Sequence, residues 1–152
     1  MSQLRARLSE ALKEALKARD ETRVSTVRLI LAGIKDRDIA ARPGNTTGIS
    51  DEEILNFMQS AIRQRQESVS MFQQGNRADL VAKEEAEIVV IRTFLPKQFS
   101  DAEVTDLARQ EIAAAAATSV KDMGKVMTAM RSKYAGQMDL GKASGIVKGL
   151  LG

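Results

Sequence analysis

The spacing of apolar residues is the feature of this sequence that most restricts its fold. In the first third of the chain they recur at intervals of three or four in two runs, the first at Leu4, Leu8, Leu12 and Leu16 and the second at Val24, Val27, Leu31 and Ile34. Such intervals place side chains on one face of an α-helix. Because similar spacing continues through nearly the whole chain, which holds only two prolines, we predict an all-α protein built from amphipathic helices.

Short polar patterns mark where these helices begin. At a helix start, a hydroxyl or carboxylate accepts hydrogen bonds from N–H groups that the first turn leaves unpaired. In a capping box, a Glu or Gln three residues later returns a bond to the cap. The predicted caps are Asp20, Ser50 with Glu53, Ser100 with Glu103, Ser119 with Asp122, and Asp139, which starts a last helix over residues 140–151.

Glycine and proline divide the chain into two parts. Residues 42–48 form a turn-rich loop, Gly75 ends the third helix, and Pro96 ends the fourth, predicted over residues 77–94. We place the domain boundary after Pro96. Residues 1–96 are expected to form an N-terminal domain of four helices that starts with a helical hairpin, and residues 97–152 a C-terminal domain of three helices, small enough to depend on packing against the first.

Composition narrows the chemistry open to this chain. Histidine and cysteine are both absent from its 152 residues, so no imidazole or thiolate is available as a general base, nucleophile or metal ligand. We therefore expect a binding module with no catalytic residue, no metal and no cofactor. The longest apolar runs are too short to span a membrane and the first residues lack a signal-peptide pattern, so we expect a cytoplasmic protein without a membrane partner.

Charge is unevenly distributed along the chain. Residues 119–152 carry six basic and two acidic side chains, whereas residues 43–118 carry seven basic and twelve acidic ones. The C-terminal excess of positive charge favours an anionic partner, although charged helix faces are often only solvated surface.

Two patterns allow a catalytic interpretation and a structural one. Residues 136–143 (GQMDLGKA) nearly match a phosphate-binding loop, but Ala143 stands at the position of the magnesium ligand and a helix precedes the loop. A glycine-kinked turn is the favoured interpretation, and its amides beside Lys142 could still receive a phosphate. The acidic residues Glu84, Glu85 and Glu87 are interpreted as a solvated helix face in preference to an acid/base pair or a magnesium site.

Two further patterns allow a binding interpretation. Met123, Met127 and Met130 are spaced as a core stripe or as an adaptable peptide groove, and the core is favoured. A basic group, Arg63, Arg65 and Arg77, is interpreted as pairing with Glu67, Asp79 and the acidic fourth helix in preference to binding phosphate.

Several segments resemble the GatB/YqeY family, and the similarity runs from end to end. They are residues 25–35 (STVRLILAGIK), residues 63–68 (RQRQES) leading through Phe72 and Gly75 to residues 77–80 (RADL), residues 94–98 (FLPKQ) and residues 122–127 (DMGKVM). The resemblance implies a helical protein of two parts, similar to the tail domain of the tRNA-dependent amidotransferase. In that enzyme the tail is a tRNA-binding appendage. Such proteins often carry the label of a carbon–nitrogen ligase with glutamine as amido-N-donor, but the domains that perform this chemistry have no counterpart here.

The resemblance and the charge pattern lead to one hypothesis about function. We expect a non-catalytic module that binds tRNA or another structured RNA. The expected RNA-binding residues are Lys121, Lys125, Arg131, Lys133, Gly141, Lys142 and Lys148, with Gly141 allowing close backbone approach. Specificity would come from RNA shape, because Tyr134 is the only aromatic residue of the basic segment. The alternative is an adaptor for the amidotransferase or another translation protein, using the charged segments or the loop around Gly44 to Gly48, or an accessory role in amidation.

Overall fold

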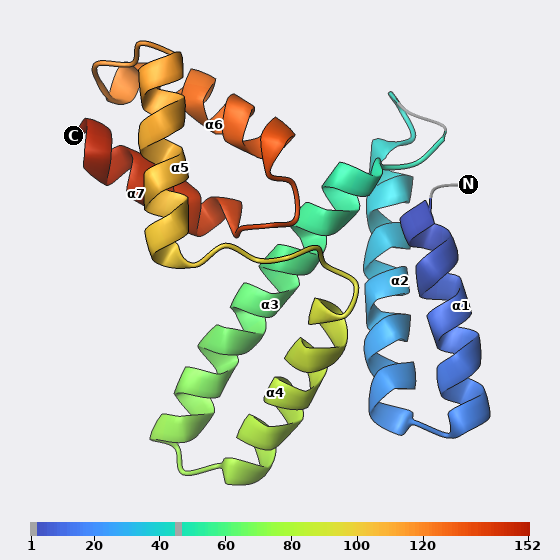
Figure 1. Cartoon of the computed structure of the whole chain (residues 1–152). Coiled ribbons are helices and arrows are strands. Elements are labelled where there is room, and N and C mark those ends of the chain that lie inside the picture. Colours follow the sequence, from blue (N-terminus) through green and yellow to red (C-terminus); the bar gives the residue numbers. More distant parts are fainter. Residues whose placement is uncertain (1–2, 45–46) are drawn as a thin grey trace. The chain divides into compact units, whose positions relative to one another are not determined.

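The computed structural model describes residues 3–44 and 47–152, and helices are the only regular secondary structure in these two ranges (Figure 1). The prediction of an all-α protein is confirmed. The helices of the described residues are α1 (Gln3–Ala18), α2 (Glu21–Ala41), α3 (Asp51–Gln74), α4 (Ala78–Arg92), α5 (Asp101–Ala114), the 3₁₀ turn η1 (Val120–Asp122), α6 (Met123–Lys133) and α7 (Leu140–Leu151).

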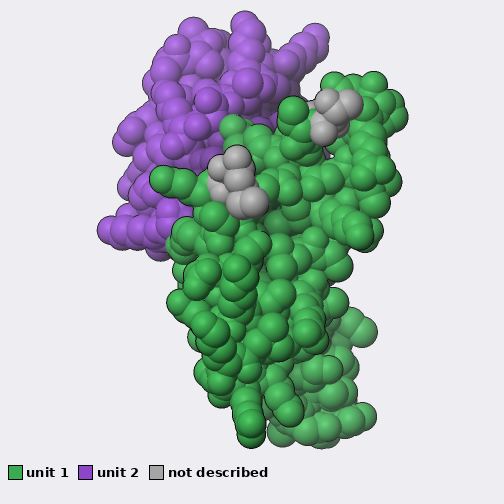
Figure 2. Space-filling model, turned by 90° about the vertical axis from the view of Figure 1, so that its right-hand side faces the viewer, with its two compact units in different colours: residues 1–95 green, residues 96–152 purple. Residues whose placement is uncertain are grey.

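The chain divides into two compact units between Leu95 and Pro96 (Figure 2). Unit 1 is residues 1–95 and unit 2 is residues 96–152, and each has a hydrophobic core of its own. Pro96 cannot continue a helix because its nitrogen carries no hydrogen and its ring fixes φ. α4 ends at Arg92, two residues before the predicted end at Phe94, and the chain runs without regular structure from Thr93 to Ser100.

Unit 1 consists of two helical hairpins, α1 with α2 and α3 with α4 (Figure 1). α2 packs against α4, which joins the two hairpins around one core. The largest fully buried side chains of this core are Leu8, Val27, Ile54, Met58 and Ile91. Gly33 on α2 lets the Phe57 ring of α3 approach closely, since a Cβ at this position would overlap a carbon of that ring.

Asp20 and Ser50 both cap helices as predicted, but the capping box expected at Ser50 and Glu53 is incomplete, because the Glu53 carboxylate accepts from the Ser50 hydroxyl and not from the Ser50 N–H. Asp20 accepts a hydrogen bond from the Arg23 N–H at 3.1 Å, and the Ser50 hydroxyl accepts one from the Glu53 N–H at 3.2 Å. The end of α3 differs in detail from the expectation, because Asn76 and not Gly75 takes the left-handed conformation, with φ of 56°. Asn tolerates this conformation better than most residues, so the turn still closes within a few residues.

An ion pair between the first two helices holds the end of the loop that follows α2. The Asp38 carboxylate accepts two hydrogen bonds from the Arg5 guanidinium, at 2.8 and 2.9 Å, and a third from the Ile49 N–H at 2.8 Å. Gly48 lies against this pair with φ of 94°. Residues 45 and 46 of the predicted loop lie outside the described residues, but its C-terminal end is held in place by Asp38.

Two predictions about the acidic fourth helix have different outcomes. The basic residues of this region do pair within unit 1, as Arg65 contacts Glu87 at 3.0 Å and Arg77 contacts Asp79 at 3.1 Å. The prediction that Glu87 belongs to a solvated face is wrong, because its side chain is buried beside Arg65. A carboxylate can be buried at this position because the guanidinium supplies both a hydrogen bond and a compensating charge.

Unit 2 is a three-helix assembly of α5, α6 and α7 (Figure 1). Its capping box is confirmed, since the Ser100 hydroxyl accepts from the Glu103 N–H while the Glu103 carboxylate accepts from the Ser100 N–H. The prediction that Ser119 and Asp122 cap α6 directly is wrong. Ser119 caps η1 instead, and the Asp122 carboxylate accepts from the Thr118 N–H at 3.0 Å, so a tight 3₁₀ turn precedes α6.

The core of unit 2 settles the meaning of the methionine stripe. Met130 is fully buried, and Met123 and Met127 pack against the same cluster, so the favoured interpretation as core is confirmed. The remaining buried members of this core are Val104, Ala108, Val126, Met138, Ala143 and Val147.

Candidate nucleic-acid interface

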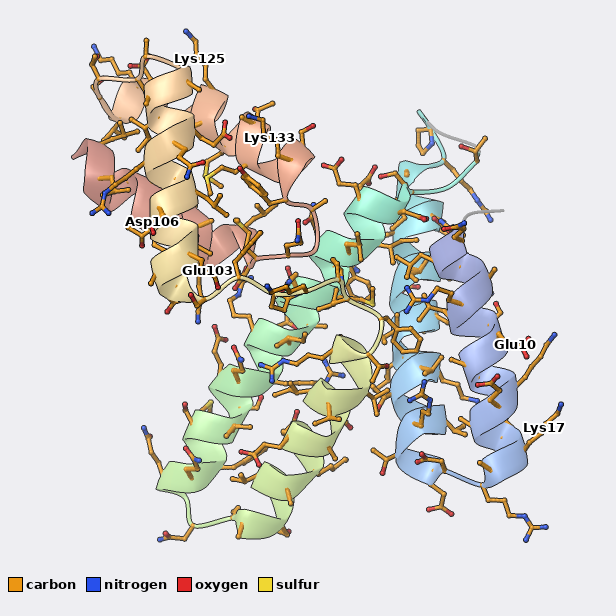
Figure 3. The ribbon with its side chains drawn as sticks, in the orientation of Figure 1. Glu10, Lys17, Glu103, Asp106, Lys125 and Lys133 are labelled. Atoms are coloured by element: carbon orange, nitrogen blue, oxygen red, sulfur yellow. The ribbon has the colours of Figure 1, made fainter. Side chains whose placement is uncertain are left out.

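Six of the eight basic residues of unit 2 occupy the surface of α6, α7 and the turn η1, and the other two are Lys97 and Arg109. Lys125, Arg131 and Lys133 project from α6, Lys142 and Lys148 from α7, and Lys121 from η1, and all six are exposed. In contrast, four of the five charged side chains of α5 are acidic. Two of them, Glu103 and Asp106, are labelled in Figure 3. Positive and negative charge are therefore segregated onto different helices of the same unit.

The outer face of α6 combines small side chains with cations. Gly124, Thr128 and Ser132 recur at intervals of four and are exposed, so they form a strip along one side of the helix, which we call the α6 strip. Lys125 and Arg131 lie on either side of it. Nothing lies within 4 Å of a Cβ added at Gly124, so the strip is open to a large ligand.

The outer face of α7 repeats this arrangement. Gly141, Gly145 and Gly149 recur at intervals of four and are exposed, and they form the α7 strip between Lys142 and Lys148. A Cβ added at Gly145 or Gly149 would meet no atom within 4 Å. The opposite side of the helix carries the buried Ala143 and Val147, so the glycines are not there to allow helix–helix packing.

Most of the predicted RNA-binding cations are available to a ligand. Within the part of the chain that the structure describes, five of them make no ion pair. These five are Lys121, Lys125, Arg131, Lys142 and Lys148. Exposed cations that form no ion pair keep most of their attraction for phosphate groups. Among these five, Lys125 also interacts electrostatically with Asp122.

Lys133 differs from the other predicted cations because it forms an ion pair within unit 2. Its ammonium donates to both oxygens of the Glu111 carboxylate, at 2.8 and 3.1 Å. The hydrogen bond to Glu111 raises the pKa of Lys133 above its usual value. Glu111 is only 5% exposed, so Lys133 serves first as the charge partner of a buried carboxylate.

Tyr134 is not placed to stack on a nucleic-acid base. Its ring makes an edge-to-face contact with Phe99, with centroids 5.8 Å apart, and its hydroxyl donates to Glu111 at 3.4 Å. Burial raises the pKa of the Tyr134 hydroxyl, and the Glu111 charge adds to this effect. The sole aromatic residue of the basic segment is thus part of the packing of unit 2.

The glycine-rich segment before α7 is a turn between two helices. Gly136 has φ of 74°, which favours glycine, and Ala143 is fully buried. The Gly141 N–H donates to the Asp139 carboxylate at 3.0 Å. A negative side chain therefore already occupies the amide at which the sequence indicated a phosphate, and Gly141 contributes its lack of a side chain instead.

The described residues contain neither a cluster of metal ligands nor a membrane-spanning helix. No group of three or more Asp or Glu side chains among them is arranged to hold a metal ion. None of the helices described is both long and apolar enough to cross a lipid bilayer.

Two features of this region are not predicted from the sequence. The Lys133–Glu111 pair joins residues 22 positions apart, a separation that no helical interval indicates. The α6 and α7 strips are the second feature that the sequence-based predictions lack, although the interval of four between their small residues is visible in the sequence.

Relatives of this chain are found among yeast proteins. It is 40% identical over 91 residues to the protein named "Altered inheritance of mitochondria protein 41, mitochondrial" of Lachancea thermotolerans, covering 59% of this chain and 46% of that protein. The protein of the same name from Vanderwaltozyma polyspora is 34% identical over 88 residues, which are 58% of this chain and 46% of that protein. An uncharacterized protein of Schizosaccharomyces pombe is 29% identical over 98 residues, which are 64% of this chain and 76% of that protein.

These relatives correct the expectation of a cytoplasmic protein. The first two are named as mitochondrial proteins. The composition of such a chain does not distinguish a cytoplasmic protein from a mitochondrial one. The matched segment spans about half the length of these mitochondrial relatives.

A family model gives broader coverage than any of these pairs. The model described as YqeY-like protein matches residues 5–151, and so includes both units and every predicted RNA-binding residue. This confirms the resemblance noted from the sequence segments. The chain belongs to the YqeY-like protein family.

Proposed function

We propose that unit 2 binds a structured RNA, with tRNA as the first candidate, through the outer faces of α6 and α7 and without catalysing a reaction. The observation that carries this proposal is that exposed cations without an ion pair lie beside open strips of small residues. Lys125 and Arg131 border the α6 strip, and Lys142 and Lys148 border the α7 strip. The similarity to the amidotransferase tail favours tRNA over other structured RNAs.

The physical basis is the approach of a sugar–phosphate backbone to a flat helix surface. Small side chains let the backbone come close to the helix, and the bordering cations then meet phosphates on both sides. Each phosphate that is neutralised releases counterions, which supplies affinity that falls as salt is added. Recognition would depend on RNA shape, since Tyr134 is packed against Phe99 and offers no free ring.

The predicted residues contribute unequally in this proposal. Lys121, Lys125, Arg131, Lys142 and Lys148 supply the charge. Lys133 contributes less, because its ammonium is bound to Glu111, and its main effect is on the packing between α5 and α6. Gly141 contributes as part of the α7 strip. The module would act as a binding partner in tRNA-dependent amidation or translation, with any carbon–nitrogen ligase chemistry residing in other proteins.

Fluorescence anisotropy of labelled, unfractionated tRNA tests this proposal on the full chain. The test variant is Lys125→Glu/Lys142→Glu, and the control is Lys35→Glu/Lys83→Glu, which makes the same change of charge at exposed positions of α2 and α4 in unit 1. Titrations between about 50 and 200 mM salt, with a duplex RNA competitor, measure the electrostatic contribution.

The expected result is specific to unit 2. With roughly three to five phosphate contacts, log affinity falls with log salt with a slope of about −3 to −4, and the test variant makes this slope shallower by about 2. The control variant retains affinity and slope to within the general effect of net charge. Equal affinities of the test variant and the unmodified chain would refute the proposal, and so would complete displacement of tRNA by any duplex.

A further inference from the structure

Unit 1 carries an apolar groove that neither the core nor the RNA proposal explains. The groove has a volume of about 700 Å³ and lies where α1 ends and α2 begins. Its walls and floor include Leu16 of α1, Arg19 of the connecting turn, and Val24, Arg28, Leu29 and Ala32 of α2. We call this feature the hairpin groove.

The apolar surface of the groove is more than packing of unit 1 requires. α2 already buries Val27, Ile30 and Ile34 toward the core. Leu29, on another face of the same helix, is 55% exposed, and Leu16 is 48% exposed. A helix with apolar residues on its solvent side as well as its core side is typical of one that packs against a further partner.

The charged residues that line the groove are two arginines, Arg19 and Arg28, and one carboxylate, Glu21. Arg19 and Arg28 are exposed, and within the described residues neither forms an ion pair or a side-chain hydrogen bond. Arg23, by comparison, lies over the Phe94 ring at 5.6 Å and faces the core. Lys17 does not line the groove, and its side chain points into solvent (Figure 3). A ligand that carries acidic groups beside an apolar surface could therefore contact both the two arginines and the apolar lining of the groove.

Arg19 adds an observation from the backbone. It has φ of 55°, the left-handed conformation that ends many helices. Glycine or asparagine is the usual residue at such a position, because a side chain with a Cβ is strained there. The chain therefore places a cation at the groove rim at a position where local structure favours a different residue.

We propose that the hairpin groove binds an amphipathic helix of a partner protein, with acidic residues flanking its apolar stripe. Apolar residues at helical intervals would lie along Leu16, Val24 and Leu29, while Asp or Glu side chains on the flanks reach Arg19 and Arg28. Complementary charge also selects the partner, because a basic helix would bring like charges together at the rim.

Charge and composition argue against two other occupants. In a two-fold dimer through this groove, the same surface serves both copies. Four arginines, Arg19 and Arg28 of each copy, would then meet only two carboxylates, Glu21 of each copy. An RNA would find no aromatic side chain among the lining residues on which to stack a base.

Fluorescence anisotropy on the full chain, with a panel of three labelled helical peptides, tests this proposal. Each peptide has about 14 residues, or roughly four turns. The first carries a leucine stripe flanked by Glu, the second the same stripe flanked by Lys, and the third has Ser in place of the leucines. The variants are Arg19→Glu/Arg28→Glu and Leu29→Ser. Ile39→Ser is the matched control, because Ile39 is a 45% exposed residue of α2 that does not line the groove.

The expected result is a reversal of charge preference. The Glu-flanked peptide binds the unmodified chain at least about tenfold more tightly than the Lys-flanked peptide, and Arg19→Glu/Arg28→Glu inverts that order. Leu29→Ser weakens both peptides, Ile39→Ser weakens neither, and the serine peptide does not bind. Lys125→Glu/Lys142→Glu leaves peptide binding unchanged, so this result is independent of the RNA proposal.

Three results would overturn the proposal. The first is failure of the Glu-flanked peptide to bind, or binding that neither Leu29→Ser nor Arg19→Glu/Arg28→Glu changes. The second is a dimer in sedimentation equilibrium that Leu29→Ser dissociates, which would assign the groove to a second copy. The third is loss of tRNA binding in Leu29→Ser, which would assign it to RNA. All these positions are exposed, so the variants are expected to fold, and circular dichroism checks this.

Discussion

Replacing Asp38 by Asn tests the ion pair that links α1, α2 and the loop before α3. The carboxylate has three hydrogen bonds, two from Arg5 and one from the Ile49 N–H. An amide keeps one oxygen and places an NH₂ group against a donor of Arg5. Asp38→Asn therefore removes the charge and leaves two donors facing each other.

The size of the effect follows from the pKa of Asp38. The hydrogen bond from Arg5, followed by the one from Ile49, lowers this pKa from 3.8 to about 2. A shift of nearly two units corresponds to about 2.4 kcal/mol at neutral pH, because one unit is about 1.4 kcal/mol. The Asp38 side chain is 25% exposed, and screening by solvent lowers the expected loss to about 1–2 kcal/mol.

The dependence on pH has a definite sign. The folded chain holds Asp38 with a lowered pKa, so its contribution to stability is fully present above the pKa of the unfolded chain. It is lost as the pH falls from about 4 toward 2. At pH 3 about half of the contribution remains. The difference between Asp38→Asn and the unmodified chain should therefore shrink by about half between pH 7 and pH 3.

Urea unfolding at a series of pH values measures this difference. The signal of the fully buried Ile91 in NMR spectra reports on unit 1 by itself. Asp36→Asn is the control, because Asp36 is an exposed carboxylate on the same helix, and its loss is expected to stay within about 0.5 kcal/mol. A loss for Asp38→Asn that is the same at pH 7 and pH 3, or no larger than that of the control, would refute the reasoning.

Three further predictions concern packing. Gly33→Ala is expected to lower stability by about 1–2 kcal/mol, since the added methyl meets the Phe57 ring. Gly145→Ala should raise stability by about 0.5–1 kcal/mol, because its surroundings are open. Thermal unfolding of both variants shows whether the two changes in stability have opposite signs. Phe94→Ala is expected to cost about 3–5 kcal/mol in urea unfolding, because the ring is only 4% exposed, and a loss below about 1 kcal/mol would contradict this burial. Lys133→Ala should lower the melting temperature more than Glu111→Gln, because it leaves a buried carboxylate without its cation. The reverse order would contradict the cost expected for this unpaired carboxylate.

Helix positions were largely predictable because the interactions that define them are local. The caps Asp20, Ser50 and Ser100 each accept from the N–H group three residues further on, so their pattern is visible in the sequence. The prediction at Ser119 was wrong because a 3₁₀ turn and an α-helix begin with similar residues, and the choice between them depends on how α6 packs.

The candidate interface was predictable in part. An excess of positive charge over residues 119–152 was visible in composition, and exposure of these cations follows from helical periodicity. Which of them is neutralised was not visible. Lys133 meets Glu111 because α5 and α6 lie side by side, and the sequence interval between these residues carries no sign of the contact.

By itself, the sequence determined an all-α chain, most of its helix limits and its concentration of basic residues, because each depends on local hydrogen bonding, periodicity or composition. Only the tertiary structure decided that Asp38 holds the loop end through Arg5, that Glu87 and Glu111 are buried with a cation, and that Leu16 and Leu29 form the hairpin groove. These features depend on distances between helices. Such distances are set by how whole faces pack together, and no interval along one helix encodes them.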